Sequence, residues 1–372
     1  MKKKLMYIFG TRPEAVKICP LIRETAGRSC FENVVCVTGQ HRDMLDQVME
    51  IFEVTPDYDL DVMKADQTLF DITKAVMQPL QEILTKEQPD IVIVHGDTTT
   101  SYCAALSAFY LGIPIAHVEA GLRSHDMHSP YPEEFNRRAI SLISDYDFAP
   151  TFDAGQNLIR EGKDPDRIFV TGNTVIDALK YTVTEDFSHP LLDWAGDDFI
   201  LITAHRRETR GEVMRRMFEG IKKALMEHPE HRAILPVHKN PKIGVLAKEV
   251  FEGCDSIRIE PALDVKTFHN LEARCYLCLT DSGGIQEECP SFKKPVLVMR
   301  DVTERNEGIT AGYACLTGTD GESIYKKVKE LLENKAAYDK MICAHNPYGD
   351  GMACKRIADA LTDCICASDT SD

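Results

Sequence analysis

Short apolar runs alternate with helix-length amphipathic segments along most of this 372-residue chain, and this alternation limits the possible folds more than any other feature. Such runs are typical of buried parallel strands joined by crossover helices, so the chain is predicted to be α/β. In the first half, the predicted strands are residues 5–9, 33–38, 91–95, 113–118, 146–150 and 167–170. The predicted helices there include residues 15–25, 44–52, 70–86 and 101–110.

The pattern starts again after a polar, weakly patterned stretch at residues 181–198. The strands predicted in this half are residues 199–203, 233–237, 257–259, 275–280, 296–299 and 314–316. The predicted helices are residues 211–227, 266–273, 285–289 and 321–333. The repeated alternation of strands and helices, together with the length of the chain, favours two doubly wound, Rossmann-like domains, residues 1–178 and 179–350. The loops at the carboxyl ends of their strands are expected to face one cleft.

Composition and charge exclude several classes of function. Hydrophobic residues make up 44% of the chain and charged residues 27%, which is typical of a soluble globular enzyme. A net charge of −16 disfavours nucleic acid and anionic membrane surfaces as partners, so an anionic ligand would need a local cationic pocket. No apolar run approaches the roughly 20 residues of a membrane span. The apolar run near the N-terminus is too short for a signal peptide, and we expect a cytoplasmic protein.

Cysteine and histidine spacings give no sign of a metal centre or a disulfide framework. The 13 cysteines are irregularly spaced, and the one CxxC, Cys275 and Cys278, has no second pair. Buried reduced thiols are the expected state. His95, His117 and His205 flank predicted strand ends, but no HxH or HxxxH pattern occurs, and we expect neither a metal nor a cofactor.

Three carboxylates, Asp97, Glu119 and Glu133, fall within 37 positions. The first two follow predicted strands, and the carboxyl edge of a parallel sheet is where ligands bind in open α/β folds. Glu133 follows a proline-containing turn. Each one alone is explained by a helix cap or a loop acid. The three together favour acid–base catalysis, because carboxylates near a ligand can move protons.

Cationic and glycine-rich loops follow other predicted strands. In IFGTRPEAVK, Pro13 fits the first position of a helix whose N-terminus would attract an anion, and Arg12 and Lys17 add charge. ITAHRRETR places His205, Arg206 and Arg207 at the equivalent position of the second half. LTDSGGIQEE offers Gly283 and Gly284, although it matches neither common nucleotide-binding glycine motif.

Taken in order, these segments resemble the non-hydrolysing UDP-N-acetylglucosamine 2-epimerases over nearly the whole chain. The matching segments are GTRPEAVK, HGDTTT, HVEAGLR, YPEEFNR, TGNTVIDAL, HRRE, PVHKNP, LTDSGGIQEE, KPVLVMRDVTER and AHNPYGDGMACKRI. The resemblance implies two Rossmann-like domains similar to the B-type glycosyltransferases, with a last helix at about residues 351–366 that returns to the first domain. It also implies a homodimer that binds UDP-N-acetylglucosamine and UDP, supplying N-acetylmannosamine for cell-envelope polysaccharide.

The resemblance further implies a role for individual residues. The reaction would eliminate UDP to give 2-acetamidoglucal and then add it back, giving UDP-N-acetylmannosamine. The residues implied for catalysis are Asp97, Glu119, Glu133 and His205; those implied for substrate binding are Arg12, Lys17, Phe268, Ser282, Gly283, Gly284, Glu288 and Arg305. Gln40, His41, Arg207 and His238 fall in segments that would line a second, activating substrate site. Asp66 stands where some relatives carry arginine, a departure that weakens the expectation of such regulation.

Three alternatives stay open at this point. A hydrolysing epimerase would release free N-acetylmannosamine and UDP from the same intermediate. A B-type glycosyltransferase would share the fold but would not exchange the C2 proton of its donor. A non-catalytic nucleotide-sugar sensor would need the phosphate loops but not the three carboxylates.

Overall fold

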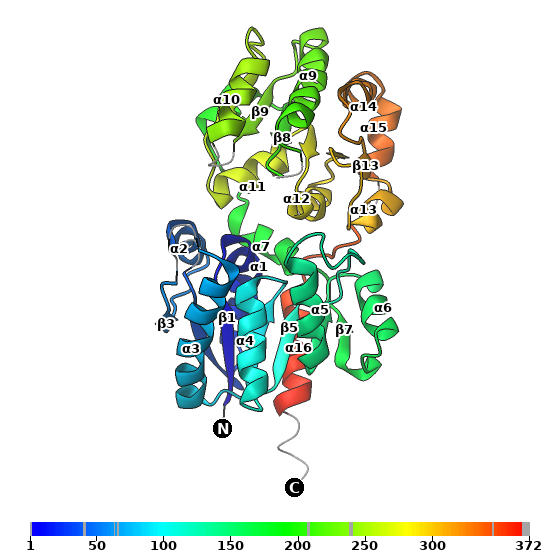
Figure 1. Cartoon of the computed structure of the whole chain (residues 1–372). Coiled ribbons are helices and arrows are strands. Elements are labelled where there is room, and N and C mark those ends of the chain that lie inside the picture. The colour runs from blue at the N-terminus through cyan, green and yellow to red at the C-terminus, as the bar shows by residue number, and fades with distance from the viewer. Residues whose placement is uncertain are drawn as a thin grey trace. The chain divides into compact units, whose positions relative to one another are not determined.

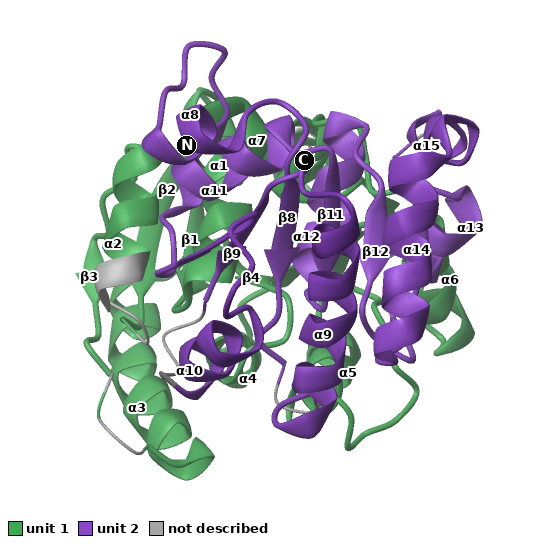
Figure 2. Ribbon diagram, turned by 90° about the horizontal axis from the view of Figure 1, so that it is seen from above, with its two compact units in different colours: residues 1–181, 348–372 green, residues 182–347 purple. Residues whose placement is uncertain are grey.

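The computed structural model describes residues 2–39, 42–62, 64, 67–206, 209–237, 241–343 and 346–366. Contacts divide the chain into two compact units: unit 1 comprises Met1–Tyr181 and Tyr348–Asp372, and unit 2 comprises Thr182–Pro347 (Figure 2). Each unit is an α/β sandwich built on one parallel sheet.

The sheet of unit 1 has the strand order β3-β2-β1-β4-β5-β6-β7 among the described residues, and all its pairings are parallel. The strands are β1 (Lys3–Phe9), β2 (Phe31–Val37), β3 (Tyr58–Asp59), β4 (Ile91–His95), β5 (Ile115–Val118), β6 (Tyr146–Ala149) and β7 (Ile168–Val170). The order reverses between β1 and β4, as in a Rossmann sheet. The loops that follow β1 and β4 run in opposite directions from this point, and the space between these two loops can hold a ligand.

Helices cover both faces of this sheet: α1 (Arg12–Ala26), α2 (Arg42–Ile51), α3 (Leu69–Glu87), α4 (Thr99–Tyr110), α5 (Glu133–Ile143), α6 (Phe152–Arg160), α7 (Thr174–Thr182) and α16 (Ala353–Leu361). Contacts join α3 to α4 and α4 to α5, while α1 contacts α2 and α16 (Figure 1). Alternate strand residues such as Met6 and Ile8 pack with Val76 and Leu80 of α3 in a fully buried core. Helix α16, near the end of the chain, thus packs in the first unit.

Unit 2 repeats the plan with strand order β10-β9-β8-β11-β12-β13. Its strands are β8 (Ile200–Thr203), β9 (Ala233–Pro236), β10 (Ile257–Glu260), β11 (Leu277–Thr280), β12 (Val296–Val298) and β13 (Ala314–Leu316). Its helices are α8 (Pro190–Ala195), α9 (Glu212–Glu227), α10 (Pro241–Val250), α11 (Val265–Arg274), α12 (Gly283–Glu288), α13 (Asn306–Ala311), α14 (Gly321–Glu333) and α15 (Lys335–Ile342). The switch point lies between β8 and β11.

Glycines let α9 and α14 approach closely. A Cβ added to Gly220 would lie 2.1 Å from the carbonyl oxygen of Gly321, and one on Gly321 would lie 2.3 Å from that of Arg216. Because backbone atoms cannot move aside cheaply, both positions require glycine.

The fold class predicted from the sequence is confirmed: the chain is α/β with two doubly wound parallel sheets. Each predicted strand forms, with ends that differ by a residue or two. Strand β3 was not predicted because two residues are too short for a periodic signal. The stretch at residues 181–198 contains α8, which the pattern did not reveal. Pro13 is the second residue of α1, and Thr11 is its N-cap.

Candidate active site

The loops that leave β1 and β4 are joined by one buried carboxylate, Glu14. Its Oε2 accepts hydrogen bonds from the backbone of Gly10 (3.1 Å) and Thr11 (2.8 Å), and Thr11 caps α1 in return. Its Oε1 accepts from Thr98 Oγ1 (2.7 Å) and Ser101 Oγ (2.8 Å) at the start of α4. Glu14 therefore holds together the two loops of the switch point, a role that sequence analysis missed. The capping-box spacing TxxE was the available signal.

Glu119 directly follows β5 in a left-handed backbone conformation with a φ of +63°. Such strain in a non-glycine residue costs of order 1–3 kcal/mol and often occurs at functional sites. Its Oε2 forms an ion pair with Lys17 of α1, both side chains being about nine-tenths buried, and accepts a hydrogen bond from Asn173 Nδ2 at 2.9 Å.

His95, the last residue of β4, lies beside this carboxylate. The Nε2 atom of His95 is 4.0 Å from Glu119 Oε2 and has no hydrogen-bond partner among the described residues. Burial lowers the pKa of His95 to about 4, although the charge of Glu119 opposes this shift. The ring is therefore neutral at pH 7.

Asp97 follows β4 and is held by α5. Its Oδ2 is 2.7 Å from Arg137 Nη2, and its backbone carbonyl accepts a hydrogen bond from Asn136 Nδ2 at 2.9 Å. Arg137 is buried and also lies 3.6 Å from the buried Glu134. The side chain of Asp97 keeps 27% of its surface exposed, so a ligand can reach it.

The structure places the three predicted carboxylates at the same edge of the unit 1 sheet. Gly96 donates its N–H to Val118 O at 2.9 Å, so Asp97 and Glu119 leave adjacent strands side by side. A Cβ on Gly96 would lie 3.6 Å from Glu119 Oε1. Glu133 begins α5, the helix that supplies Asn136 and Arg137, and its Oε2 is buried without a hydrogen-bond partner in the described structure. Arg12, half-buried, begins α1 at this edge.

The switch point of unit 2 is organised by Asp281, which follows β11 as Asp97 follows β4. Its Oδ2 accepts the backbone N–H groups of His205 and Arg206, both at 2.9 Å, and its Oδ1 lies 3.2 Å from His205 Nδ1. Burial raises the pKa of Asp281, but the hydrogen bonds and charge of His205 outweigh burial, and the pKa stays below its usual value. Asp281 fixes His205 while leaving its ring partly exposed. Sequence analysis did not select it, although its position after a strand was the same signal used for Asp97.

Ser282, Gly283 and Gly284 open α12, with Ser282 at the N-cap. A Cβ on Gly283 would lie 2.6 Å from Arg305 Cζ, so the guanidinium group lies directly on this glycine. Arg305 Nε donates to Glu287 Oε1 at 2.9 Å, which fixes its orientation. A helix N-terminus and a held guanidinium together make a site suited to a phosphate group.

Glu304 lies among three arginines of this site. It forms ion pairs with Arg305, with Arg300 (2.8 Å) and, more loosely, with Arg206 (3.6 Å). Burial raises the pKa of Glu304, but the charges of Arg305 and Arg300 outweigh burial and lower it to about 2. The carboxylate therefore stabilises the folded state fully above its unfolded pKa of about 4.5, and loses that contribution as the pH falls toward 2.

We therefore expect Glu304→Gln to destabilise the protein at pH 7 by a few kcal/mol, on the order of 3. This difference from wild type should shrink steadily at pH 4 and pH 3. The single tryptophan, Trp194, lies in unit 2, so urea unfolding followed by its fluorescence measures the relevant unit. Exposed Glu252→Gln controls for loss of one charge. If the loss of stability in Glu304→Gln is the same at pH 7 and pH 3, the lowered pKa of Glu304 is contradicted.

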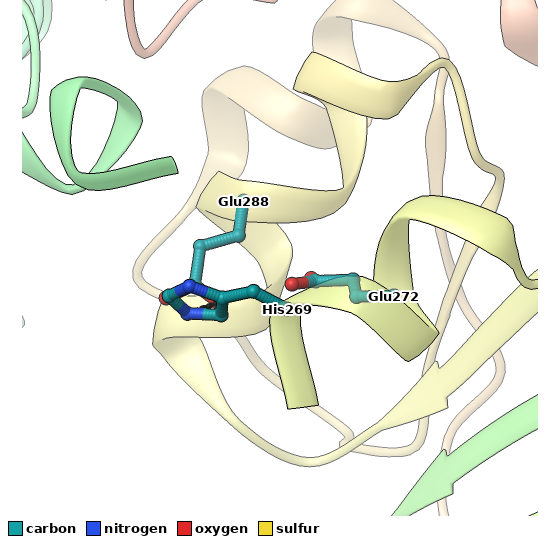
Figure 3. A group of neighbouring side chains, drawn as sticks. All are labelled: His269, Glu272 and Glu288. Atoms are coloured by element: carbon teal, nitrogen blue, oxygen red, sulfur yellow. Dashed lines mark ion pairs between the residues drawn. The ribbon is translucent and has the colours of Figure 1, made fainter. Parts of the chain in front are cut away.

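Glu288 at the end of α12 belongs to a buried group with His269 and Glu272 of α11 (Figure 3). His269 Nε2 is 3.5 Å from Glu288 Oε2, and Phe268 lies half-buried beside His269 on α11. Within the described ranges, these three residues are the set of histidine, cysteine and acidic ligand atoms close enough to hold a cation. Gln40, His41, Arg207 and His238, predicted for a second substrate site, lie outside the described residues, as does Asp66.

Two doubly wound α/β units, with acids at the sheet edge of one and a phosphate-type helix N-terminus in the other, define a Rossmann-type protein of the nucleotide-binding class. In the described part of the chain, no helix combines the length and apolar character that crossing a membrane requires. The chain belongs to the UDP-N-acetylglucosamine 2-epimerase family, whose model matches residues 23–362.

Individual relatives match this chain over nearly their whole length. A UDP-N-acetylglucosamine 2-epimerase of Bacillus subtilis is 50% identical over 97% of this chain and 96% of its own. A crystal structure of a Listeria monocytogenes protein has a TM-score of 0.94 at 49% identity, covering 98% of this chain and 96% of that one. The UDP-GlcNAc 2-epimerase of Neisseria meningitidis, solved bound to UDP-GlcNAc, has a TM-score of 0.91 at 41% identity, covering 97% and 100%.

Proposed function

We propose that the protein interconverts UDP-N-acetylglucosamine and UDP-N-acetylmannosamine without hydrolysis. A base removes the C2 proton, the C1–O bond to UDP breaks, and its electron pair leaves with UDP to give 2-acetamidoglucal. UDP then adds back at C1 while C2 is protonated on the opposite face. The observation that carries this proposal is the grouping of Asp97, Glu119 and Glu133 at one sheet edge. Removal and return of the proton on opposite faces call for at least two acid–base groups, or one that can move.

The proposed roles divide between the two units. Unit 1 carries the acid–base groups, with Lys17 and Arg12 supplying positive charge. Unit 2 binds UDP: Ser282, Gly283, Gly284 and Arg305 bind phosphate, Glu288 the ribose hydroxyls and Phe268 the base. His205, fixed by Asp281, stabilises the departing diphosphate, an electrostatic contribution that is usually large for such a step.

Proton exchange at C2 tests the proposal. The enzyme is incubated with UDP-N-acetylglucosamine in D₂O and followed by proton NMR. We expect deuterium at C2 of both nucleotide sugars and an approach to a constant ratio of the two. Accumulation of UDP and free N-acetylmannosamine would instead identify the hydrolysing epimerase, and absence of exchange would favour a glycosyltransferase or a sensor.

Assembly, location and metabolic use are also part of the proposal. We propose a cytoplasmic homodimer whose product supplies N-acetylmannosamine for cell-envelope polysaccharide, with no nucleic acid or membrane partner. Light scattering after size-exclusion chromatography tests the dimer. A monomer at micromolar concentration would contradict it.

The contact between Gly283 and Arg305 gives a specific prediction for UDP binding. In Gly283→Ala, the new methyl group would displace the guanidinium, since the end of an arginine side chain moves more easily than backbone. We expect UDP to bind about tenfold more weakly, the loss of one charge-assisted hydrogen bond. Gly244→Ala in α10, a residue with no role in the proposed UDP site, is the matched control, because its Cβ would meet only Val237 Cγ2 at 3.7 Å, an ordinary contact. Calorimetric titration with UDP measures both, and equal affinities in the two variants would contradict the prediction.

A further inference from the structure

A buried acid that the proposed mechanism does not use, Glu272, lies next to Glu288. Both acids and His269 are buried, and their ligand atoms lie within 4.8 Å of one another. The three side chains point toward one another from α11 and α12 (Figure 3). Two ionised carboxylates in contact would be costly in such a site, so a proton or a cation must separate them.

The two oxygens of Glu272 have different contacts. Its Oε1 accepts a hydrogen bond from Cys289 Sγ at 3.0 Å. Its Oε2 is buried and has no hydrogen-bond donor among the described residues. Burial, then the charge of Glu288, then Cys278, raise the pKa of Glu272 well above the usual carboxyl range. A neutral acid with its proton on Oε2 satisfies both oxygens.

In contrast to those of Glu272, the oxygens of Glu288 face a basic side chain and the glycine loop. Its Oε2 faces His269 Nε2 at 3.5 Å, and the other ring nitrogen, Nδ1, is fixed by Thr182 Oγ1 at 2.8 Å. Its Oε1 lies near the glycine loop, since a Cβ on Gly284 would be 3.4 Å from it. The one basic side chain of the group thus faces Glu288 and not Glu272.

We propose that Glu272 is a positioning residue: as a neutral acid, it donates a hydrogen bond to Glu288 and holds that carboxylate in the orientation that accepts the ribose hydroxyls. The inference rests on the proposed UDP site. Glutamine at position 272 can reproduce both interactions, because its amide nitrogen donates to Glu288 and its oxygen accepts from Cys289. An apolar residue of similar size cannot.

The test compares Glu272→Gln with Glu272→Leu, using two ligands. UDP carries both ribose hydroxyls, and 2′,3′-dideoxyuridine diphosphate carries neither. We expect Glu272→Leu to bind UDP about tenfold more weakly than wild type and to bind the dideoxy ligand with unchanged affinity. We expect Glu272→Gln to resemble wild type with both ligands. A merely structural defect would weaken the binding of both ligands alike. The ratio of the Kd for the dideoxy ligand to the Kd for UDP therefore separates the positioning role from a structural one.

Several outcomes would overturn the inference. Equal losses of affinity for both ligands in Glu272→Leu would indicate a packing role. A Glu272→Gln that behaves like Glu272→Leu would show that an uncharged hydrogen-bond donor at position 272 is not sufficient, which contradicts the neutral acid. Stoichiometric Zn²⁺ binding by wild type that is lost in Glu272→Gln would identify a cation site instead. If Glu272→Leu does not fold, Glu272→Met serves as the second apolar variant. A wild type that does not prefer UDP over the dideoxy ligand would contradict the role proposed for Glu288, a failure distinct from that of Glu272.

Discussion

Asp97→Asn is expected to lower kcat about 10²–10⁴-fold while the Kd for UDP stays within about twofold of wild type. The asparagine side chain keeps a hydrogen-bond acceptor for Arg137, which lies 2.7 Å from the carboxylate, so the local structure should persist. An amide cannot take up or return a proton at neutral pH, so only the rate of the proton-transfer step should fall. Epimerisation is measured by proton NMR and UDP binding by calorimetry.

The matched control for this prediction is Asp153→Asn, an exposed aspartate in the first turn of α6 in the same unit. It removes the same charge and should leave kcat and Kd unchanged. Arg12→Ala provides the opposite case, since loss of its charge should weaken UDP binding. Equal losses of UDP binding in Asp97→Asn and Arg12→Ala would contradict the proposed division of roles.

Lys17→Met is expected to destabilise unit 1 by about 3–5 kcal/mol, because it leaves the carboxylate of Glu119 buried without its cationic partner. For a unit of this size, the loss corresponds to a fall in Tm of roughly 10 °C. Thermal melting followed by circular dichroism measures it. Replacing both partners, Lys17→Met with Glu119→Gln, should recover much of the stability, because no buried charge then remains unpaired.

Lys355→Met is the matched control for the ion pair. Lys355 pairs with Asp359 on α16 at 2.7 Å, but both side chains are about half exposed. Solvent-exposed pairs contribute about 0–1 kcal/mol, so the same substitution should change Tm little. Similar melting temperatures for Lys17→Met and Lys355→Met would show that the pair with Glu119 is not the buried interaction described above.

Much of the fold could be predicted because strand and helix periodicities are local properties of the chain. The apolar runs that became β4 and β5 were visible in sequence, and so were Asp97 and Glu119, which follow them directly. A residue that follows a buried parallel strand must lie at the carboxyl edge of the sheet. The sequence by itself therefore indicates which edge of the sheet carries the acids.

The partners of these acids could not be predicted in the same way. Arg137 meets Asp97 from 40 positions further along the chain, and Asn173 meets Glu119 from 54 positions away. Asp281 reaches back 76 positions to His205. No periodicity encodes such distances, since they depend on how crossover helices return to the sheet. The left-handed backbone of Glu119 was equally invisible, because non-glycine residues seldom adopt it.

Local chemistry in the chain was enough to specify two parallel α/β sheets and the acids and glycines at their strand ends, because hydrophobic spacing and turn residues act over a few positions. Only the folded arrangement decided which charges are paired, which histidine is neutral and which buried glutamate carries a proton. Those properties depend on desolvation and on neighbours brought together from distant segments, and neither exists until the chain has packed.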